Sequence, residues 1–268
     1  MGFVFAFTTG GMTGVLLSIA PVDFQVHNSL FLIAHFHSMV IGGVLFGFLA
    51  GITYWFPKFA GFKLNEKLGK YAAYCWIVGF FVAFMPLYIL GLMGATRRLD
   101  HYETVTGWQP LFIVAAIGAA IIFVGVGFQL LQIYVSIKQR KENMDVTGDP
   151  WNGRTLEWST TSPPPFYNFA ITPEVDHIDA FWEMKHAKSK KKKPKYDMIH
   201  MPKNTSLGIF VGVFAFLSCF GFIWHMMWLA GLGAIGILVC MIIRLADKEP
   251  DYFVSAAEVE RIEATHLN

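Results

Sequence analysis

The sequence predicts an all-α protein, a polytopic bundle of transmembrane helices with about six spans. Of its 268 residues, 54% are hydrophobic and only 15% are charged, and the mean hydropathy is +0.47. Soluble domains average about 25% charged residues. Long stretches without any Asp, Glu, Lys or Arg are the second observation, because a helix crosses a bilayer with about 20 apolar residues. Together they exclude an ordinary soluble domain.

Four uncharged stretches are each long enough for one crossing, namely 1–22, 24–57, 71–96 and 104–137. A fifth, 204–243, is about twice the length of one crossing. Trp224, His225 and Trp228 lie at its middle, where interfacial side chains suit a turn, so we expect a helical hairpin. The chain opens inside the first span without the basic region or cleavage site of a signal peptide. We therefore expect a truncated start.

The charge pattern predicts four parts: four spans in 1–137, a linker in 138–203, the hairpin in 204–245 and a tail in 246–268. Basic residues gather in alternate loops, and the positive-inside rule makes these loops cytoplasmic, including the segment from Lys138 to Lys203 and the C-terminus. The tract Lys190–Lys193 fits either a contact with anionic lipid or a solvated loop.

Two histidines in the second apolar stretch are the strongest candidates for chemistry. His35 and His37 are ionisable residues within a predicted span, where such residues are rare and mark functional sites. Positions two apart on a helix project about 200° from each other. The pair therefore favours two separate cofactors, with Phe36 between them, over one metal held from one face. This geometry indicates axial ligation of two haems. A plain hydrogen-bonding role is the alternative.

The depth of these histidines gives Arg97 and Arg98 a possible role. His35 lies about seven residues, or about 10 Å, from the outer end of its span. A haem there would direct its propionates towards the outer loop that contains the two arginines, and a guanidinium binds a carboxylate with two parallel hydrogen bonds. The alternative is that these arginines cap the third span and snorkel into headgroups.

Other polar residues in the first spans are weaker candidates. Asp23 and His27 precede the histidine-bearing span and could bond propionates or help hold a hydrated cation, or they could be ordinary interfacial residues. Hydroxyls in the first span could return hydrogen bonds to their own helix, so we assign no role to Thr8, Thr9 and Thr13. The cysteines lack metal-type spacing, and packing is expected for Cys75, Cys219 and Cys240.

The run from Val22 to His37, VDFQVHNSLFLIAHFH, closely resembles subunit I of the haem-copper terminal oxidases. The family pattern continues in four further motifs: GLMGATRR at 91–98, DPW at 149–151, TLEW at 155–158 and SPPP at 162–165. The resemblance covers essentially the whole chain. It implies the later helices of the subunit I fold.

Carried over by position, the resemblance implies specific roles. His35 matches the axial ligand of the high-spin, oxygen-binding haem, and His37 matches an axial ligand of the low-spin haem. Arg97 and Arg98 match the pair at the haem propionates. The outer propionate and cation site of the family corresponds to Asp23 and His27.

The resemblance also implies a reaction and a branch of the family. Cytochrome c oxidases have an acidic residue directly after the position of His27, and this sequence has Asn28, which argues against a divalent-cation site. The tail from His200 through the hairpin is similar to bo-type ubiquinol oxidases. The implied function is a proton-pumping oxidase of the bacterial inner membrane that reduces dioxygen to water with electrons from ubiquinol. The implied cofactors are a low-spin b-type haem, a high-spin o- or a-type haem, and copper.

Much of the family's machinery lies upstream of the matched region. The copper ligands, the second low-spin haem ligand and the quinone and proton-channel residues belong there, so the copper ligands are not expected in this chain. We expect as partners the N-terminal part of subunit I, subunits II, III and IV and membrane lipids, and no nucleic acid. The alternatives are a cytochrome c oxidase subunit I, a transporter with a histidine proton relay, and a non-catalytic scaffold subunit.

Overall fold

The computed structural model describes residues 1–187 and 194–267. The tract Lys190–Lys193 lies outside the described residues. The chain forms two compact units. Unit 1 comprises Met1–Pro164 and Asp179–Trp182, and unit 2 comprises Pro165–Ile178 and Glu183–Asn268. Part of the predicted linker therefore belongs to unit 1, because it packs there.

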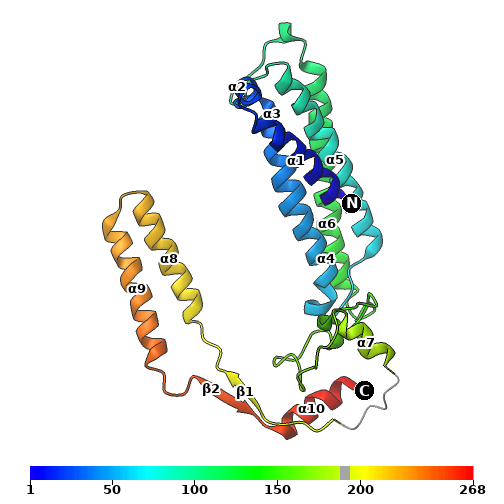
Figure 1. The fold of residues 1–268 in the computed structure, drawn as a ribbon, viewed down its shortest axis with the longest axis vertical. Helices are drawn as coiled ribbons and strands as arrows, with labels where there is room; N and C mark the ends of the chain where they lie inside the picture. The colour runs from blue at the N-terminus through cyan, green and yellow to red at the C-terminus, as the bar shows by residue number, and fades with distance from the viewer. Residues whose placement is uncertain (188–193, 268) are drawn as a thin grey trace. The chain divides into compact units, whose positions relative to one another are not determined.

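Unit 1 is a helix bundle (Figure 1). Its helices are α1 (Gly2–Leu17), α2 (Ala20–Val26), α3 (Leu30–Met39), α4 (Phe46–Ala60), α5 (Glu66–Leu92) and α6 (Gln109–Lys138). A π-helix, η1 (Val40–Leu45), joins α3 and α4 into one continuous span. Short 3₁₀ turns, η2 (Thr104–Thr106) and η3 (Leu156–Ser159), lie in its loops. A short helix, α7 (Ala180–His186), begins in unit 1.

Unit 2 contains a helical hairpin and a small sheet. The hairpin consists of α8 (Leu207–Ile223) and α9 (Met227–Leu245), joined by a turn in which His225 has a φ of 57°. Strand β1 (Ile199–Pro202) pairs antiparallel with β2 (Asp251–Val254), and α10 (Ala256–Leu267) follows. Neither strand is expected from the sequence.

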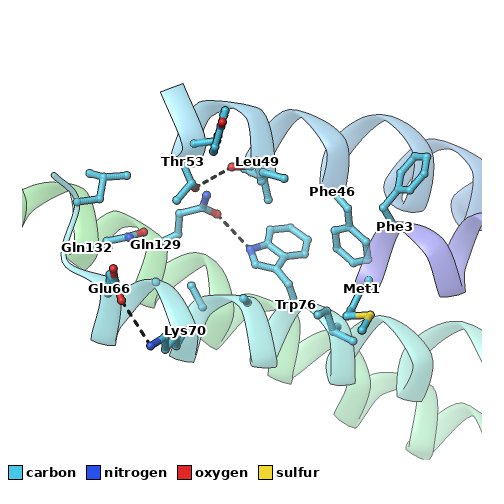
Figure 2. A pocket seen from close by; sticks show the side chains of 18 of the residues that line it. Met1, Phe3, Phe46, Leu49, Thr53, Glu66, Lys70, Trp76, Gln129 and Gln132 are labelled. Atoms are coloured by element: carbon cyan, nitrogen blue, oxygen red, sulfur yellow. Dashed lines mark hydrogen bonds and ion pairs between the residues drawn. The ribbon is translucent and has the colours of Figure 1, made fainter. Parts of the chain in front are cut away.

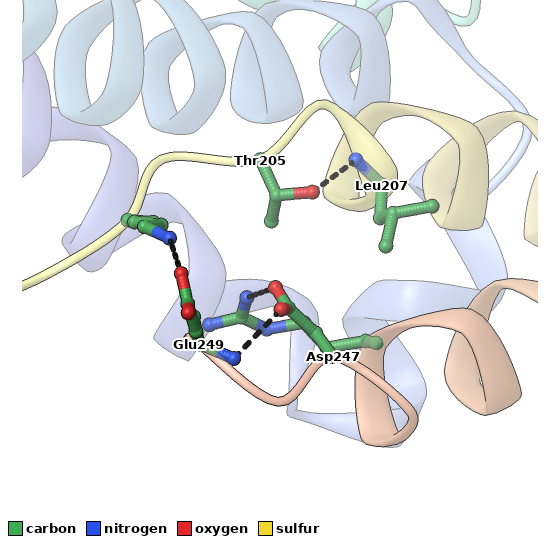
Figure 3. Close-up of polar contacts among 6 residues, drawn as sticks. Thr205, Leu207, Asp247 and Glu249 are labelled. Atoms are coloured by element: carbon green, nitrogen blue, oxygen red, sulfur yellow. Dashed lines mark hydrogen bonds and ion pairs between the residues drawn. The ribbon is translucent and has the colours of Figure 1, made fainter. Parts of the chain in front are cut away.

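Polar contacts mark the ends of the hairpin helices (Figure 3). The Thr205 hydroxyl accepts a hydrogen bond from the Leu207 amide at 3.2 Å as α8 begins. Where α9 ends, Arg244 forms an ion pair with Asp247 at 3.3 Å, and the Asp247 carboxylate also accepts the Glu249 amide at 3.0 Å. These contacts satisfy backbone and charged groups where the apolar sequence stops.

The described part of the chain has four helices long and apolar enough to cross a membrane: Leu30–Ala60, Glu66–Leu92, Gln109–Lys138 and Met227–Leu245. The count is five if α1 and α2, which are bent by 106°, form one broken span. The all-α membrane class is confirmed, but the count is below the predicted six because α8 has only 17 residues. A helix of that length reaches about 26 Å, a little less than a hydrocarbon core of about 30 Å.

Helix α5 is the central element of unit 1. In its most apolar window 39% of residues are buried, compared with 6% in the Leu30–Ala60 span. Small residues bring the α5 and α6 backbones together: a Cβ on Gly79 would lie 2.8 Å from the Ile122 amide nitrogen, and one on Gly118 would overlap the Ala83 backbone. Close approach at small residues drives helix association in lipid.

A buried ammonium group ties the loop after α6 to the end of α4. The Lys58 side chain donates hydrogen bonds to the carbonyls of Gly148 and Thr160, both at 2.8 Å, and lies 5.2 Å from the centre of the buried Trp158 ring. Burial opposes ionisation of Asp145 nearby, but the Ser162 and Thr147 side chains and the Lys58 charge hold its pKa below the usual value. The loop therefore carries a charged carboxylate at neutral pH.

We predict that Gly118→Leu disrupts the contact between α5 and α6, because its side chain would overlap the Ala83 backbone. Overpacking of this kind costs about 1–3 kcal/mol. Thermal unfolding of the detergent-solubilised protein should show a lower midpoint. The matched control is Gly127→Leu on the same helix, where a Cβ would meet nothing within 4 Å. Equal midpoints for the two variants would contradict the packing argument.

We also predict that acid loosens the loop held by Lys58. The pKa of Asp145 is lower in the folded state than its ordinary value of 3.8. The resulting stabilisation is fully present above that ordinary value and is lost as pH falls through the lower, folded pKa. Cleavage of the 145–163 loop by an acid-active protease should increase across this range. Asp145→Asn should make cleavage nearly independent of pH, and an unchanged pH profile would count against the carboxylate's role.

Candidate functional site

The histidine-bearing helix α3 begins at a well-defined cap. The buried Ser29 hydroxyl accepts a hydrogen bond from the Phe31 amide at 3.2 Å, and serine is a favoured N-cap residue. The Leu30 amide donates to the Ala95 carbonyl at 2.9 Å, and Ser29 bridges to Thr96. These bonds hold the start of α3 against the loop that follows α5. The depth and rotation of the histidines are fixed accordingly.

His35 faces α1. Its Nδ1 lies 3.0 Å from the Thr13 hydroxyl, and the ring is half-buried. Gly14 leaves the space that the ring needs, since a Cβ there would lie 3.0 Å from the His35 Cε1. The Thr13 hydroxyl is also 3.0 Å from the Tyr88 hydroxyl, which lies 3.1 Å from the Ser38 hydroxyl. A chain of polar groups therefore links His35 to side chains on α1, α3 and α5.

His37 faces α5. Its Nδ1 lies 2.8 Å from the Ile33 carbonyl, which can only accept, so Nδ1 carries the proton. Its half-buried ring stacks on Phe84 with the ring centres 4.7 Å apart. The centre of the Phe36 ring lies 4.3 Å from the centre of the His37 ring. Among the described residues, Nε2 of neither His35 nor His37 has a hydrogen-bond partner. Each ring thus offers a free nitrogen lone pair when Nδ1 carries the proton.

Arg97 is held at the outer end of α3. Its Nε donates to the Asn28 side-chain oxygen at 2.9 Å, and its backbone amide donates to the Asn28 carbonyl at 3.1 Å. Arg98 is exposed and has a φ of 67°, a left-handed conformation that costs of order 1–3 kcal/mol for a residue other than glycine. No ion pair within the described ranges involves either arginine. Both guanidinium charges therefore remain available to an anion.

Asp23 and His27 do not form a joint side-chain site with the arginines. The His27 Nδ1 lies 2.9 Å from the backbone carbonyl of Asp23 rather than from its carboxylate. Asn28, not these two residues, contacts Arg97. Within residues 1–187 and 194–267 no group of three or more His, Cys, Asp or Glu side chains could hold a metal ion.

Sequence reasoning missed Thr13, Tyr88 and Ser38. Thr8 and Thr9 bond only to their own helix, as the sequence suggested for all three threonines. Thr13 makes the same backbone contacts, at 2.9 and 3.0 Å, and in addition reaches His35. Nothing in one sequence distinguishes Thr13 from Thr9, because the difference lies in which helices are neighbours.

A separate cavity of about 610 Å³ lies in unit 1 between α1, α4, α5 and α6 (Figure 2). The Trp76 indole donates to the Gln129 side chain at 3.1 Å, and Glu66 pairs with Lys70 at 3.5 Å (Figure 2). Neither His35 nor His37 lines it. The cavity is therefore distinct from the histidine site.

Comparisons with known proteins show similarity to respiratory oxidases. Residues 1–121 match the family model "Cytochrome C and Quinol oxidase polypeptide I". The chain is 53% identical over 267 residues to "Cytochrome bo(3) ubiquinol oxidase subunit 1" of Buchnera aphidicola subsp. Schizaphis graminum, covering 100% of this chain and 40% of that protein. It is 47% identical over 271 residues to "Probable cytochrome c oxidase subunit 1" of Bradyrhizobium diazoefficiens, covering 100% and 40%.

A solved structure, "Cryo-EM structure of a heme-copper terminal oxidase dimer provides insights into its catalytic mechanism", aligns with a TM-score of 0.45 and 25% identity. That alignment covers 50% of this chain and 25% of the other.

The first 121 residues thus match a subunit I model of cytochrome c and quinol oxidases, and the chain along its whole length is similar to subunit 1 of cytochrome bo(3) ubiquinol oxidases. It spans about 40% of the length of the relatives it matches.

We predict that the His37 imidazole carries its proton on Nδ1 even when no metal is bound, because the Ile33 carbonyl beside it can only accept. Nitrogen NMR of ring-labelled histidine, assigned with His37→Gln, should show a protonated Nδ1 and an unprotonated Nε2. A protonated Nε2 would contradict the arrangement. His27 should show the same tautomer, because its Nδ1 lies 2.9 Å from the Asp23 carbonyl, which likewise can only accept.

Proposed function

We propose that this chain supplies one axial ligand to each of two haems in the catalytic subunit of a proton-pumping terminal oxidase. His35 is the ligand of the high-spin haem, and His37 is a ligand of the low-spin haem. The main support is that these two imidazoles, two positions apart on one helix, contact different neighbouring helices. Among the described residues each ring forms a hydrogen bond only through Nδ1. Each ring can thus serve a different cofactor.

The donor set fits this proposal. A neutral imidazole ligates iron through the nitrogen that carries no proton, and a hydrogen bond from the other nitrogen fixes the ring. Both histidines have such a contact at Nδ1, and neither lies in a cluster that would chelate one ion. When bound, the haems and copper supply the electron-transfer and oxygen-reduction chemistry. The copper ligands belong to sequence outside the matched segment.

Arg97 and Arg98 bind the haem propionates in this proposal. The Asn28 oxygen is uncharged, so it orients Arg97 through Nε without neutralising the guanidinium. A carboxylate can then use the two terminal nitrogens of the same group. Asp23 on α2 and His27 at the end of that helix lie one helical turn apart, and in this proposal they belong to the outer polar rim.

Ubiquinol is the proposed electron donor. Support comes from the similarity to a bo(3)-type ubiquinol oxidase and from Asn28, which stands where cytochrome c oxidases carry an acidic residue. A cytochrome c donor is the second candidate, since a probable cytochrome c oxidase is 47% identical. The similarity to these oxidases favours an oxidase over a transporter or scaffold subunit.

The proposed location is the bacterial inner membrane. In unit 1 the basic loops meet at one end, since the Lys63 amide donates to the Asn143 carbonyl at 2.9 Å. The positive-inside rule makes that end cytoplasmic, together with the Lys138–Lys203 segment and the C-terminus. The remainder of subunit I, subunits II, III and IV, and membrane lipids are the proposed partners.

The test is a reduced-minus-oxidised spectrum of membranes that contain this chain together with the remainder of subunit I. His35→Ala should abolish carbon monoxide binding by the high-spin haem, whereas His37→Ala should abolish the low-spin signal. His225→Ala, in the hairpin turn, is the control and should leave both signals intact. A single shared phenotype for His35→Ala and His37→Ala would refute the assignment of two separate cofactors.

A further inference from the structure

We propose that Thr13 is a positioning residue for His35, and that Tyr88 and Ser38 complete a hydrogen-bonded chain across three helices that holds the imidazole in its ligating tautomer. This inference rests on the proposed role of His35 as a haem ligand. It adds three residues from α1, α3 and α5 to the site.

The Thr13 hydroxyl has the right number of partners for this role. It has one proton and two lone pairs. The proton can go to the Thr9 or Gly10 carbonyl, at 2.9 and 3.0 Å, as is usual for threonine in a helix. The lone pairs then accept the Nδ1 proton of His35 and the Tyr88 hydroxyl proton, each over 3.0 Å. His35 ligation through Nε2 requires that Nδ1 proton.

Burial makes this chain of hydrogen-bonded side chains rigid. Tyr88 is 7% exposed and Ser38 is fully buried. Because Tyr88 gives its proton to Thr13, the Ser38 hydroxyl donates to the Tyr88 oxygen at 3.1 Å. The Ala34 carbonyl, at 2.9 Å, is the competing acceptor of that one proton. The Tyr88 ring packs edge-on against Phe31 with centres 5.0 Å apart. A buried polar group without a partner costs about 1–3 kcal/mol, so every member of the chain resists leaving it.

The two histidines are held in different ways. His37 uses the carbonyl of Ile33 on its own helix, so its orientation is set within α3. His35 uses a hydroxyl from α1, so its orientation depends on how α1, α3 and α5 pack. A hydroxyl is also a weaker acceptor than a carbonyl, and the partner of a ligating histidine tunes its basicity. Thr13 therefore acts on one haem only.

The experiment compares the purified oxidase with its Thr13→Val variant, which keeps the side-chain shape and removes the acceptor. Resonance Raman spectroscopy of the reduced high-spin haem measures the iron–imidazole stretch. Thr13→Val should shift this band to lower frequency and leave the low-spin absorbance unchanged. Removing the hydrogen-bond partner of a ligating histidine typically costs about 10–100-fold in metal affinity, so the variant should also lose its high-spin haem more readily.

Three further variants make the result specific. Thr13→Ser retains the hydroxyl and should restore the wild-type band. Tyr88→Phe removes only the next hydroxyl and should shift the band less, in the same direction. Thr9→Val is the matched control, because the Thr9 hydroxyl bonds only the Phe5 carbonyl, and its band should not move.

The outcomes separate this inference from the proposed function. If the wild-type oxidase has a carbon-monoxide-binding haem that His35→Ala removes, but Thr13→Val leaves the iron–imidazole band in place, the positioning role is wrong and the ligand assignment stands. If Thr13→Ser behaves as Thr13→Val does, the hydroxyl is not the cause. If His35→Ala retains that haem, the ligand assignment itself fails.

Discussion

The helix pairs of unit 1 depend on one constraint: a polar group inside a bilayer must find its partner within the protein. Near His35 and His37, the partners are arranged so that each Nδ1 has one and each Nε2 has none among the described residues. The free nitrogens are therefore the only unpaired polar atoms of the two rings. An exogenous partner at these positions removes a cost that the helix bundle otherwise carries.

The same constraint explains how the ends of the bundle are organised. At one end the Asn28 side chain and backbone bond Arg97, which brings the loop after α5 onto the start of α3. At the other end, Lys58 donates hydrogen bonds to two loop carbonyls beside the buried Trp158. Without Lys58 these carbonyls would lose that partner. In both cases a single basic residue converts an irregular segment into a fixed surface. The central helix α5 then fixes the distance between the two ends.

The sequence was sufficient for the class of the protein and for the placement of most helices, because charge-free stretches directly report the bilayer. The spacing of His35 and His37 was likewise enough to suggest that they serve different neighbours. The bend between α1 and α2, the β1–β2 pair and the contacts of Thr13 and Tyr88 were not predicted. These features arise from which segments meet in three dimensions, whereas periodicity in one sequence reports only the faces of a single helix.

The Leu30–Ala60 span buries only 6% of its apolar window, although it carries both histidines. Almost all of that window is therefore left to face lipid or other polypeptide. The placement of this helix in the bilayer then depends on the thickness and composition of its surroundings more than on its own chain.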